Sequence, residues 1–166
     1  MNEWYVVRVK TSHEDRAAWH LRNQDFKVYL PKYRKTIRHA RKTQSVLRPL
    51  FPGYLFVNMD TASQPWRSIN GTVGVLSLVQ FGLQPQSIDS SIIDMIRLRE
   101  DQDGIVSIAP QGLKKGDTIR VLEGAFADHT ALLEEVSDDK RVILLLNLMG
   151  REVRVHASAE SLAKVS

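Results

Sequence analysis

The run from Leu50 to Met59 constrains the fold more than any other part of the 166-residue chain. It consists of a Pro-Gly turn followed by a nearly unbroken apolar stretch. Successive side chains of a strand point to opposite faces, so Tyr54 and Phe56 share one face while Leu55 and Val57 share the other. A strand that is apolar on both faces belongs in the middle of a sheet. We therefore expect an α+β domain built around this strand.

Local patterns predict how the rest of residues 1–99 folds around it. Segments rich in aromatic and β-branched residues indicate strands, and apolar residues that recur with helical spacing indicate helices. The expected strands are residues 4–10, 28–31 and 73–79, with a β-ribbon over 33–49, and the expected helices are 12–24, 63–69 and 89–99. Together they predict an antiparallel sheet flanked by helices.

Two of these helices have recognisable start signals. Ser12, with Asp15 three residues later, resembles a capping box in which Asp replaces the usual Glu. Ser63 and Pro65 are residue types that favour an N-cap and a first helical turn. We expect helices to begin at both places.

The predicted β-ribbon is unusually basic. Residues 32–49 hold seven Lys and Arg side chains and one His, and no Asp or Glu. Such a surface can contact phosphates, which requires charge and reach but no readout of bases. Arg38, Arg41 and Lys42, near the exposed tip, are therefore candidates for nucleic-acid binding. The alternative is a solvated hairpin that its charge keeps soluble.

The net charge of +4 hides an asymmetry between the two parts of the chain. Residues 1–99 contain 15 Lys and Arg against 7 Asp and Glu, whereas residues 100–166 contain 8 against 12. The first part thus carries +8 and the second −4. This division favours two domains with different partners, the first facing a polyanion. Two ordinary solvated surfaces would give the same counts.

Composition and spacing disfavour several classes of protein. The absence of Cys excludes disulfides and thiolate zinc sites. No secretory signal pattern is visible, and the longest apolar run, Val142 to Leu146, is too short to span a bilayer. The five His residues lack metal-ligand spacing, and Gly71 to Gly74 lacks the residues of a phosphate-binding loop. We expect a cytoplasmic protein that is not an enzyme and has no cofactor, metal site or membrane association.

The remainder of the chain predicts a linker and a second domain. Residues 100–113 lose periodicity and mix acids with two glycines and a proline, which is typical of an interdomain linker. Gly116-Asp117 then predicts a turn, and short strands separated by turns, beginning at residues 118–122, predict a small barrel. We expect residues 114–166 to form this domain.

Several of these segments together resemble the NusG family of transcription factors. In the first domain the resemblance rests on Trp4-Tyr5-Val6-Val7, on the run from Leu50 to Val57, and on Gly74-Val75 upstream of Phe81-Gly82. In the second it rests on residues 116–121 and 123–128, which look like a KOW motif. The run with Phe-Pro-Gly-Tyr is specific, whereas KOW motifs also occur in ribosomal proteins. The resemblance implies an N-terminal NGN-like domain and a small C-terminal KOW β-barrel.

The resemblance also implies a monomeric factor that binds RNA polymerase and discourages pausing. Its first domain would place an apolar patch of Phe51, Tyr54 and Phe56 on the clamp helices of the β′ subunit. Trp66 and Arg67 would make a contact with the β subunit. From the residues alone, the same aromatic side chains could instead be the core of a sheet that is covered on both faces.

The KOW domain of such a factor recruits a partner. The resemblance implies either the termination factor Rho or the ribosomal protein that acts as NusE. The residues expected to contact it are Phe126, Ile143, Leu145 and Met149.

A second set of nucleic-acid candidates lies around the first helix. Arg16 and His20 are four residues apart and share a helix face, and Lys10 ends the strand beside it. Because similar proteins touch the displaced, non-template DNA strand near this position, the resemblance implies this role for them, and extends it to Arg22 and Thr72. The alternative is an exposed helix face with a neutral His.

The C-terminal domain departs from the general NusG pattern. Residues 142–149 read Val-Ile-Leu-Leu-Leu-Asn-Leu-Met, and this leucine string, with Ile69-Asn70-Gly71-Thr72, resembles the RfaH-type paralogues, which are operon-specific antiterminators. Leu is a better helix former than β-branched residues, and Asp138-Asp139 would suit a helix start. We hypothesise a domain that forms either a β-barrel or a helical hairpin, the latter covering the patch of Tyr54 and Phe56.

Other segments are closer to the general factor. Pro65-Trp66-Arg67 and Gly150-Arg151 look like NusG, and Val73 replaces a basic residue of RfaH-type sequences. We favour an RfaH-type paralogue, with a housekeeping NusG as the alternative. A ribosome-associated KOW protein that binds RNA is a further alternative, but it would need a basic C-terminal domain.

Overall fold

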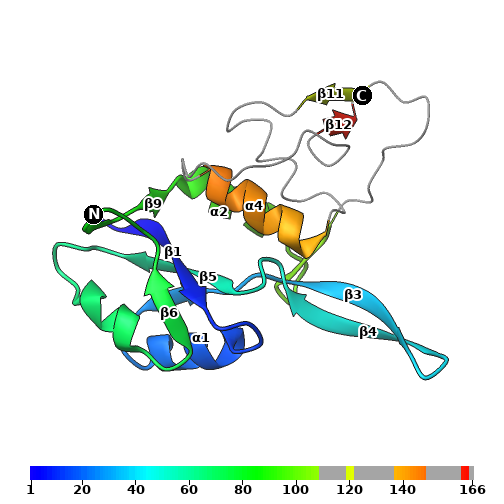
Figure 1. Cartoon of the computed structure of the whole chain (residues 1–166), viewed down its shortest axis with the longest axis horizontal. Helices are drawn as coiled ribbons and strands as arrows, with labels where there is room; N and C mark the ends of the chain where they lie inside the picture. Colours follow the sequence, from blue (N-terminus) through cyan, green and yellow to red (C-terminus); the bar gives the residue numbers. More distant parts are fainter. Residues whose placement is uncertain (109–118, 122–136, 149–161, 165–166) are drawn as a thin grey trace. The chain divides into compact units, whose positions relative to one another are not determined.

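The structure is a computed structural model that describes residues 1–108, 119–121, 137–148 and 162–164 (Figure 1). The chain divides into two units, Met1–Val106 and Ser107–Ser166. The first unit therefore ends seven residues beyond the boundary at residue 99 expected from the sequence.

An antiparallel sheet of five strands organises the first unit. Its strands are β1 (Glu3–Val9), β2 (Lys27–Tyr29), β5 (Tyr54–Met59), β6 (Val75–Leu78) and β9 (Ser87–Ile88). The order is β2-β5-β1-β6, with β9 also paired to β1. The β1–β5 pairing runs from Glu3 opposite Met59 to Arg8 opposite Tyr54. The predicted antiparallel sheet with β5 inside it is confirmed.

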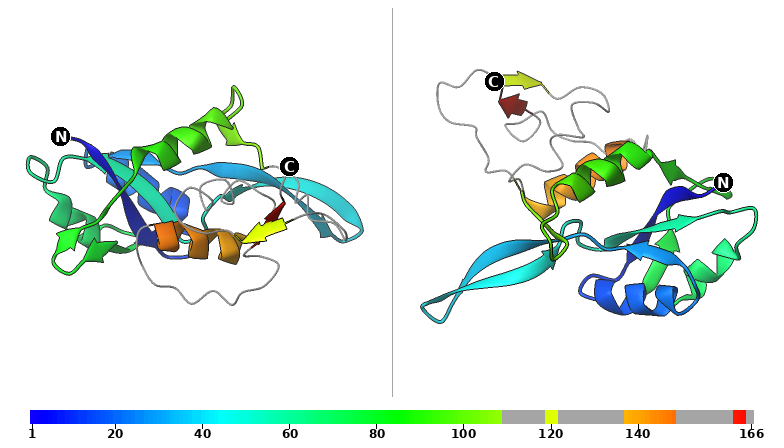
Figure 2. Two further views of the ribbon diagram at one scale, coloured as in Figure 1. Left: turned by 90° about the horizontal axis from the view of Figure 1, so that it is seen from above. Right: turned by 180° about the vertical axis from the view of Figure 1, so that it is seen from behind.

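Helix α1 (Glu14–Arg22) covers one face of this sheet (Figure 2). Its buried side chains Ala17, Ala18 and Leu21 join Leu55 and Val57 of β5 in one hydrophobic core. The 3-10 helix η1 (Trp66–Gly71) and helix α2 (Ser90–Leu98) complete the helices of this unit. The predicted α+β fold with flanking helices is therefore confirmed for the first unit.

The predicted N-cap of the first helix is wrong by one residue. Helix α1 has His13 at its N-cap, without a side-chain cap, and Ser12 has a φ of 69°. Asp15 does not close a capping box, because its carboxylate pairs with the Lys32 ammonium at 2.6 Å. The ion pair thus takes the side chain that the box would need.

The predicted N-cap at Ser63 is also wrong. Asp60 and Gln64 form a turn first, in which the Gln64 backbone N–H donates to the Asp60 carbonyl at 2.9 Å and the Gln64 side chain accepts from the Asp60 N–H at 2.8 Å. Helix η1 then begins after Pro65. By contrast, Asp89 caps α2 by accepting from the Ser91 N–H at 2.9 Å.

The basic ribbon is a long hairpin of β3 (Lys32–His39) and β4 (Lys42–Pro49) that extends away from the five-stranded sheet (Figures 1 and 2). It is paired from Lys32 opposite Pro49 to His39 opposite Lys42. The two turn residues, Ala40 and Arg41, have φ values of 50° and 65°. Two positive φ angles give a turn whose twist matches that of the strands. The predicted ribbon is confirmed.

The segment after α2 belongs to the first unit. Strand β10 (Ile105–Val106) pairs in parallel with Lys32 and Tyr33 of β3, and Tyr29 donates a hydrogen bond to Glu100. The beginning of the predicted linker is therefore held against the first unit. A small separate hairpin of β7 (Gln80–Phe81) and β8 (Gln84–Pro85) lies earlier in the chain.

In the second unit, the described residues form one strand pair and one helix. Strand β11 (Ile119–Val121) is antiparallel to β12 (Leu162–Lys164). Helix α4 (Asp138–Leu148) includes residues 142–148 of the leucine string, for which the sequence left strand and helix open, and it starts at the predicted Asp138-Asp139. The rest of the predicted barrel lies outside the described residues. Within those residues, no helix is long and apolar enough to cross a membrane.

Candidate functional site

The turn before β5 positions the predicted polymerase-binding residues. The Tyr54 N–H donates to the Phe51 carbonyl at 3.0 Å, and Gly53 between them has a φ of +84°. Pro followed by a residue with positive φ is the arrangement of a type II turn, for which Gly is the favoured residue. The buried Glu14 carboxylate accepts from the Gly53 N–H at 3.1 Å, so α1 holds this turn in place.

The three predicted residues differ in exposure. Phe51 and Phe56 are 1% and 0% exposed, whereas Tyr54 is half-buried. Leu55 and Val57 point into the core under α1, so Tyr54 and Phe56 share the opposite face, as the strand pattern predicts. Of the three predicted residues, only Tyr54 is therefore partly accessible in this structure.

Four rings form a continuous row on this opposite face, which we call the aromatic row: Phe51, Phe56, Tyr29 and Trp4. Their successive ring centroids are 5.6, 6.2 and 6.2 Å apart. The Arg97 guanidinium of α2 lies 5.1 Å from the ring centroids of both Trp4 and Tyr29. Such spacings are favourable for aromatic and cation–π contacts.

Sequence reasoning missed Trp4, Tyr29 and Arg97 as members of this site. The register places Tyr29 opposite Phe56 on the neighbouring strand, and Trp4 opposite Asn58. The signal available from the sequence was the alternation of large side chains within each strand. The pairing that brings them together depends on contacts distant in sequence.

Tyr29 gives the aromatic row a polar end. Its hydroxyl donates to the Glu100 carboxylate. Burial, and next the hydrogen bond to Glu100, raise the pKa of Tyr29 above its ordinary value of 10.0, while Arg97 opposes this shift. The hydroxyl therefore stays protonated and continues to donate in the neutral range.

Trp66 and Arg67 lie together on η1. The Arg67 guanidinium stands 4.7 Å from the Trp66 ring centroid. Trp66 is half-buried and packs against the core under α1, whereas Arg67 is exposed. Arg67 is thus the more accessible of this predicted pair.

The nucleic-acid candidates around α1 are brought together only in part. The Lys10 N–H donates to the Gly74 carbonyl at 2.8 Å, and Gly74 is so close to α1 that a Cβ there would lie 3.2 Å from that of Ala17. This packing sets Lys10 and residues 72–74 beside α1. Lys10 and Arg16 are exposed.

His20, Arg22 and Thr72 have different environments. Thr72 is buried, and its hydroxyl accepts from the Gln24 amide at 2.8 Å and donates to the Ser68 carbonyl at 2.9 Å. Both hydrogen-bonding capacities of this hydroxyl are thus engaged. Arg22 is exposed, and His20 is half-buried with its ring 4.9 Å from that of Trp19, at 90°.

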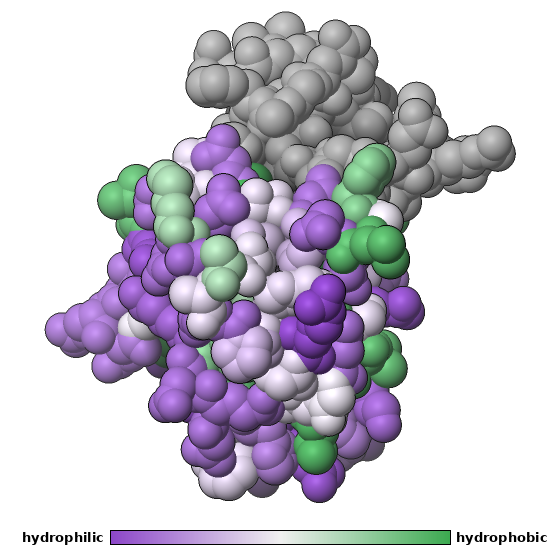
Figure 3. Space-filling view, turned by 90° about the vertical axis from the view of Figure 1, so that its left-hand side faces the viewer, coloured by the Kyte–Doolittle hydropathy of each residue, from purple (hydrophilic) through white to green (hydrophobic). Residues whose placement is uncertain are grey.

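Trp19 was missed by sequence reasoning although the sequence carried a signal. The buried stripe of Ala17, Ala18 and Leu21 leaves position 19 on the polar side of the helix, where the Trp19 side chain is 60% exposed. Figure 3 shows that hydrophobic residues on one side of the first unit lie scattered among hydrophilic ones.

The tip of the β3–β4 hairpin presents the third set of candidates. Arg38, Arg41 and Lys42 are all exposed, as is His39. Arg38 pairs with Thr43 and His39 with Lys42, so the cations occupy both faces of the ribbon. Like charges on both faces favour an anion that can wrap the tip.

Of the predicted partner-binding residues, two can be located. Ile143 is half-buried and Leu145 fully buried, both on α4, whereas Phe126 and Met149 lie outside the described residues. In the described part of the chain, no group of three His, Asp or Glu side chains could hold a metal ion.

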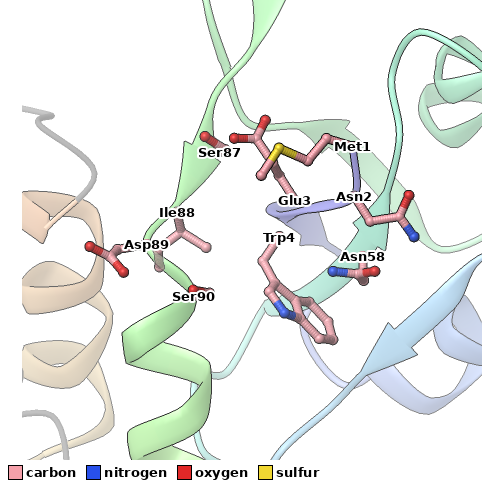
Figure 4. A pocket seen from close by; sticks show the side chains of 9 residues that line it. All are labelled: Met1, Asn2, Glu3, Trp4, Asn58, Ser87, Ile88, Asp89 and Ser90. Carbon is pink, nitrogen blue, oxygen red and sulfur yellow. The ribbon is translucent and has the colours of Figure 1, made fainter.

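A pocket of about 290 Å³ lies where β1 meets β9 and the start of α2 (Figure 4). Its lining includes Glu3, Trp4 and Asp89. Both carboxylates have structural partners, since Glu3 accepts from the Tyr5 hydroxyl at 3.0 Å and Asp89 caps α2. The pocket is therefore explained by the local fold.

Comparison with known proteins agrees with these features. The family described as "Transcription termination factor nusG" matches residues 2–97, and the KOW motif matches residues 115–144. The "Transcription termination/antitermination protein NusG" of Thermus thermophilus is 28% identical over 183 residues, covering 98% of each chain. That of Deinococcus radiodurans is 29% identical over 187 residues, also covering 98% of each.

One solved structure, "Domain interaction in Thermotoga maritima NusG", matches 75% of this chain and 74% of that one, with 21% identity and a TM-score of 0.45. The family match by itself spans more than half of the chain, from the first strand through α2. The expectation that the protein is not an enzyme is confirmed by this membership. The chain belongs to the NusG family of transcription termination and antitermination factors.

Proposed function

We propose that this protein binds RNA polymerase through the face of the sheet that carries the aromatic row, at the clamp helices of the β′ subunit. It would act as a monomer in the cytoplasm and suppress pausing. The observation that carries this proposal is the row itself, with half-buried Tyr54 beside it. Large rings with a polar end are the side chains that most often dominate protein interfaces.

The basic surfaces support a second contact, with nucleic acid. Lys10, Arg16 and the hairpin tip are exposed cations. We propose that they meet the phosphates of the displaced non-template strand. Arg67, above Trp66, is our candidate for a contact with the β subunit. The burial of Thr72 and the two hydrogen bonds of its hydroxyl support a role in fixing the loop beside α1, and we propose that role for it in place of a direct DNA contact.

The experiment for polymerase binding is co-purification of the full-length chain with RNA polymerase. Tyr54→Ala is expected to weaken binding by at least about tenfold, as truncation of an interface hot spot does. Phe81→Ala is the matched control, because Phe81 is an aromatic side chain that is 77% exposed on another hairpin. Equal binding of Tyr54→Ala and wild type would show that this face is only core.

We propose that the protein is either a housekeeping NusG or an RfaH-type specialist. The relatives named above are NusG proteins of the general kind, and they favour a housekeeping factor over the RfaH-type specialist expected from the leucine string. One observation favours the specialist: residues 138–148 form a helix, whereas a KOW barrel needs strands. In vitro transcription separates the two, because a general factor acts on all templates and a specialist only on those with its DNA element.

The second domain is proposed to recruit the ribosomal protein that acts as NusE, or Rho. Ile143 and Leu145 lie in α4, so any surface that requires them in a strand also requires this helix to refold. Backbone chemical shifts of residues 138–148 in the full-length protein test this. Helical shifts that persist when NusE is bound would rule out a partner surface built from these residues as a strand.

A further inference from the structure

The most unusual exposed side chain of the first unit is Trp19. Trp19 lies on α1, on the side of the helix opposite to the one that packs into the core, and it is 60% exposed. Burying the apolar surface of an indole ring is favourable, so a binding partner that covers Trp19 would gain free energy. Trp19 is therefore a candidate for direct contact with a ligand.

The charges around Trp19 indicate what kind of ligand this is. Arg16 and Arg22 lie three residues before and after it, so both share its side of the helix. The acid on this side, Asp15, has its carboxylate paired with Lys32 at 2.6 Å. The surroundings of the indole are consequently cationic, which favours a ligand with negative charge beside an apolar surface.

The ring is also held in place. The His20 imidazole stands at 90° to the indole, with the ring centroids 4.9 Å apart. Such an edge-to-face contact is a favourable aromatic geometry. This contact favours the observed orientation of the indole and leaves most of its surface accessible. A ring that is already oriented loses less entropy when a ligand stacks on it.

An exposed ring between two cations is the arrangement that binds single-stranded nucleic acid. Unpaired bases stack on aromatic side chains, while cations contact the phosphates between them. We propose that Trp19 stacks on an unpaired base of single-stranded DNA, with Arg16 and Arg22 on the adjacent phosphates. This inference rests on the proposed nucleic-acid contact of the α1 surface and adds to it a contact with a base.

A contrast within the first unit shows why charge decides the choice. Phe81 and Leu83 are 77% and 87% exposed at the tip between β7 and β8. Residues 80–85 include no charged side chain, so that tip offers no cation to a phosphate. Exposure is similar at both places, but only Trp19 combines it with flanking cations.

The test measures binding of the full-length chain to a fluorescently labelled single-stranded DNA of twelve nucleotides. A second oligomer with the same number of phosphates but abasic sugars removes stacking and keeps charge. Trp19→Leu is expected to bind the DNA about tenfold more weakly, the order that loss of one stacked base produces. Its binding to the abasic oligomer should equal that of wild type. Trp19→Phe should recover most of the lost affinity.

Control variants separate stacking from charge. Phe81→Leu removes an exposed ring elsewhere in the first unit, so it should change the affinity for neither the DNA nor the abasic oligomer. Arg16→Gln should weaken binding to both oligomers by the same factor. It should also lower the salt dependence of the affinity, because it removes a phosphate contact. Far-ultraviolet circular dichroism confirms that each variant is folded.

The outcomes distinguish the inference from the function on which it rests. Equal DNA binding by Trp19→Leu and wild type, or an equal loss on both oligomers, would overturn stacking while the phosphate contact stands. No binding of wild type to either oligomer would overturn both nucleic-acid proposals. Tighter binding to RNA of the same sequence would overturn the assignment to DNA. If Trp19 acts only by stacking on a base, Trp19→Leu should bind polymerase as tightly as wild type does.

Discussion

The two faces of the central sheet differ in burial and in chemistry: along β5, every position facing α1 is buried, whereas Tyr54 and Asn58 on the other face are only half-buried. On the face under α1, strand β5 contributes Leu55, Val57 and Met59 to a mostly aliphatic core that also includes Tyr5 and Phe26. On the other face it contributes Phe56 to the aromatic row. The aliphatic side chains have no polar atom, so they can only pack. The aromatic face ends in a hydroxyl and a guanidinium, which suits it to a partner as well as to folding.

Burial alone does not distinguish the two side chains at the centre of β5. Phe56 and Leu55 are both 0% exposed. What distinguishes their faces is the row of four rings with the Arg97 guanidinium over two of them, since each face carries one tyrosine hydroxyl that donates to a carboxylate. Substitutions on each face therefore have different expected consequences.

The largest effect is expected on the aliphatic face. Leu55→Ala should lower the free energy of unfolding by about 3 kcal/mol, because it leaves a cavity in a fully buried site. Urea denaturation measures this loss. Leu76→Ala on β6 is the matched control, since Leu76 is 46% exposed and its truncation should cost less than about 1 kcal/mol. Similar losses from both variants would mean that the core under α1 is loosely packed.

A smaller effect is expected from the hydroxyl of the aromatic row. Tyr29→Phe keeps the ring contacts with Trp4 and Phe56 but removes the hydrogen bond to Glu100. We expect a loss of about 1.5 kcal/mol in unfolding free energy, which is typical of a hydrogen bond to a charged group. Urea denaturation again provides the measurement.

The control for Tyr29→Phe comes from the opposite face. The Tyr5 hydroxyl donates to the Glu3 carboxylate at 3.0 Å, and Glu3 is exposed. Tyr5→Phe should therefore cost less than Tyr29→Phe, because water replaces an exposed partner readily. A larger loss from Tyr5→Phe would reverse the contrast between the two faces.

The raised pKa of Tyr29 makes this contrast dependent on pH. A group whose pKa is raised by folding contributes stability that is complete below its unfolded value, here 10.0, and is lost as the pH rises toward the folded value. Between neutral pH and pH 10.5, wild type should lose at most about 0.8 kcal/mol more than Tyr29→Phe, since the partial exposure of Tyr29 screens the effect. Urea denaturation at several pH values measures the difference. Parallel pH profiles would show that the hydroxyl ionises normally in the folded protein.

How much of this the sequence predicts depends on the range of the interactions. The faces of β5 follow from alternation within one strand, so the opposition of Tyr54 and Leu55 was predicted correctly. The hairpin was predicted from its own residues for the same reason. The aromatic row was not, because Trp4 and Tyr29 reach Phe56 only through the register of separate strands.

Competition between local and distant contacts explains the errors. Ser12 and Asp15 are the residue types of a capping box. The Asp15 carboxylate instead pairs with the ammonium of Lys32, seventeen residues further along the chain. The leucine string is a different case. Its leucines favour a helix, whereas the KOW barrel that the rest of the domain predicts needs strands, so the sequence leaves both open; residues 138–148 form helix α4.

The smallest expected effect concerns the cation on the aromatic row. Arg97→Met keeps an aliphatic side chain over Trp4 and Tyr29 but removes the positive charge, and we expect a loss of about 0.7 kcal/mol in unfolding free energy. The comparison is Arg67→Met, where the guanidinium lies over a single ring at 4.7 Å. Because Arg97 lies over two rings and Arg67 over one, Arg97→Met should cost more. Equal losses would mean that the second ring adds nothing, and that the polar character of the aromatic face rests on the Tyr29 hydroxyl alone.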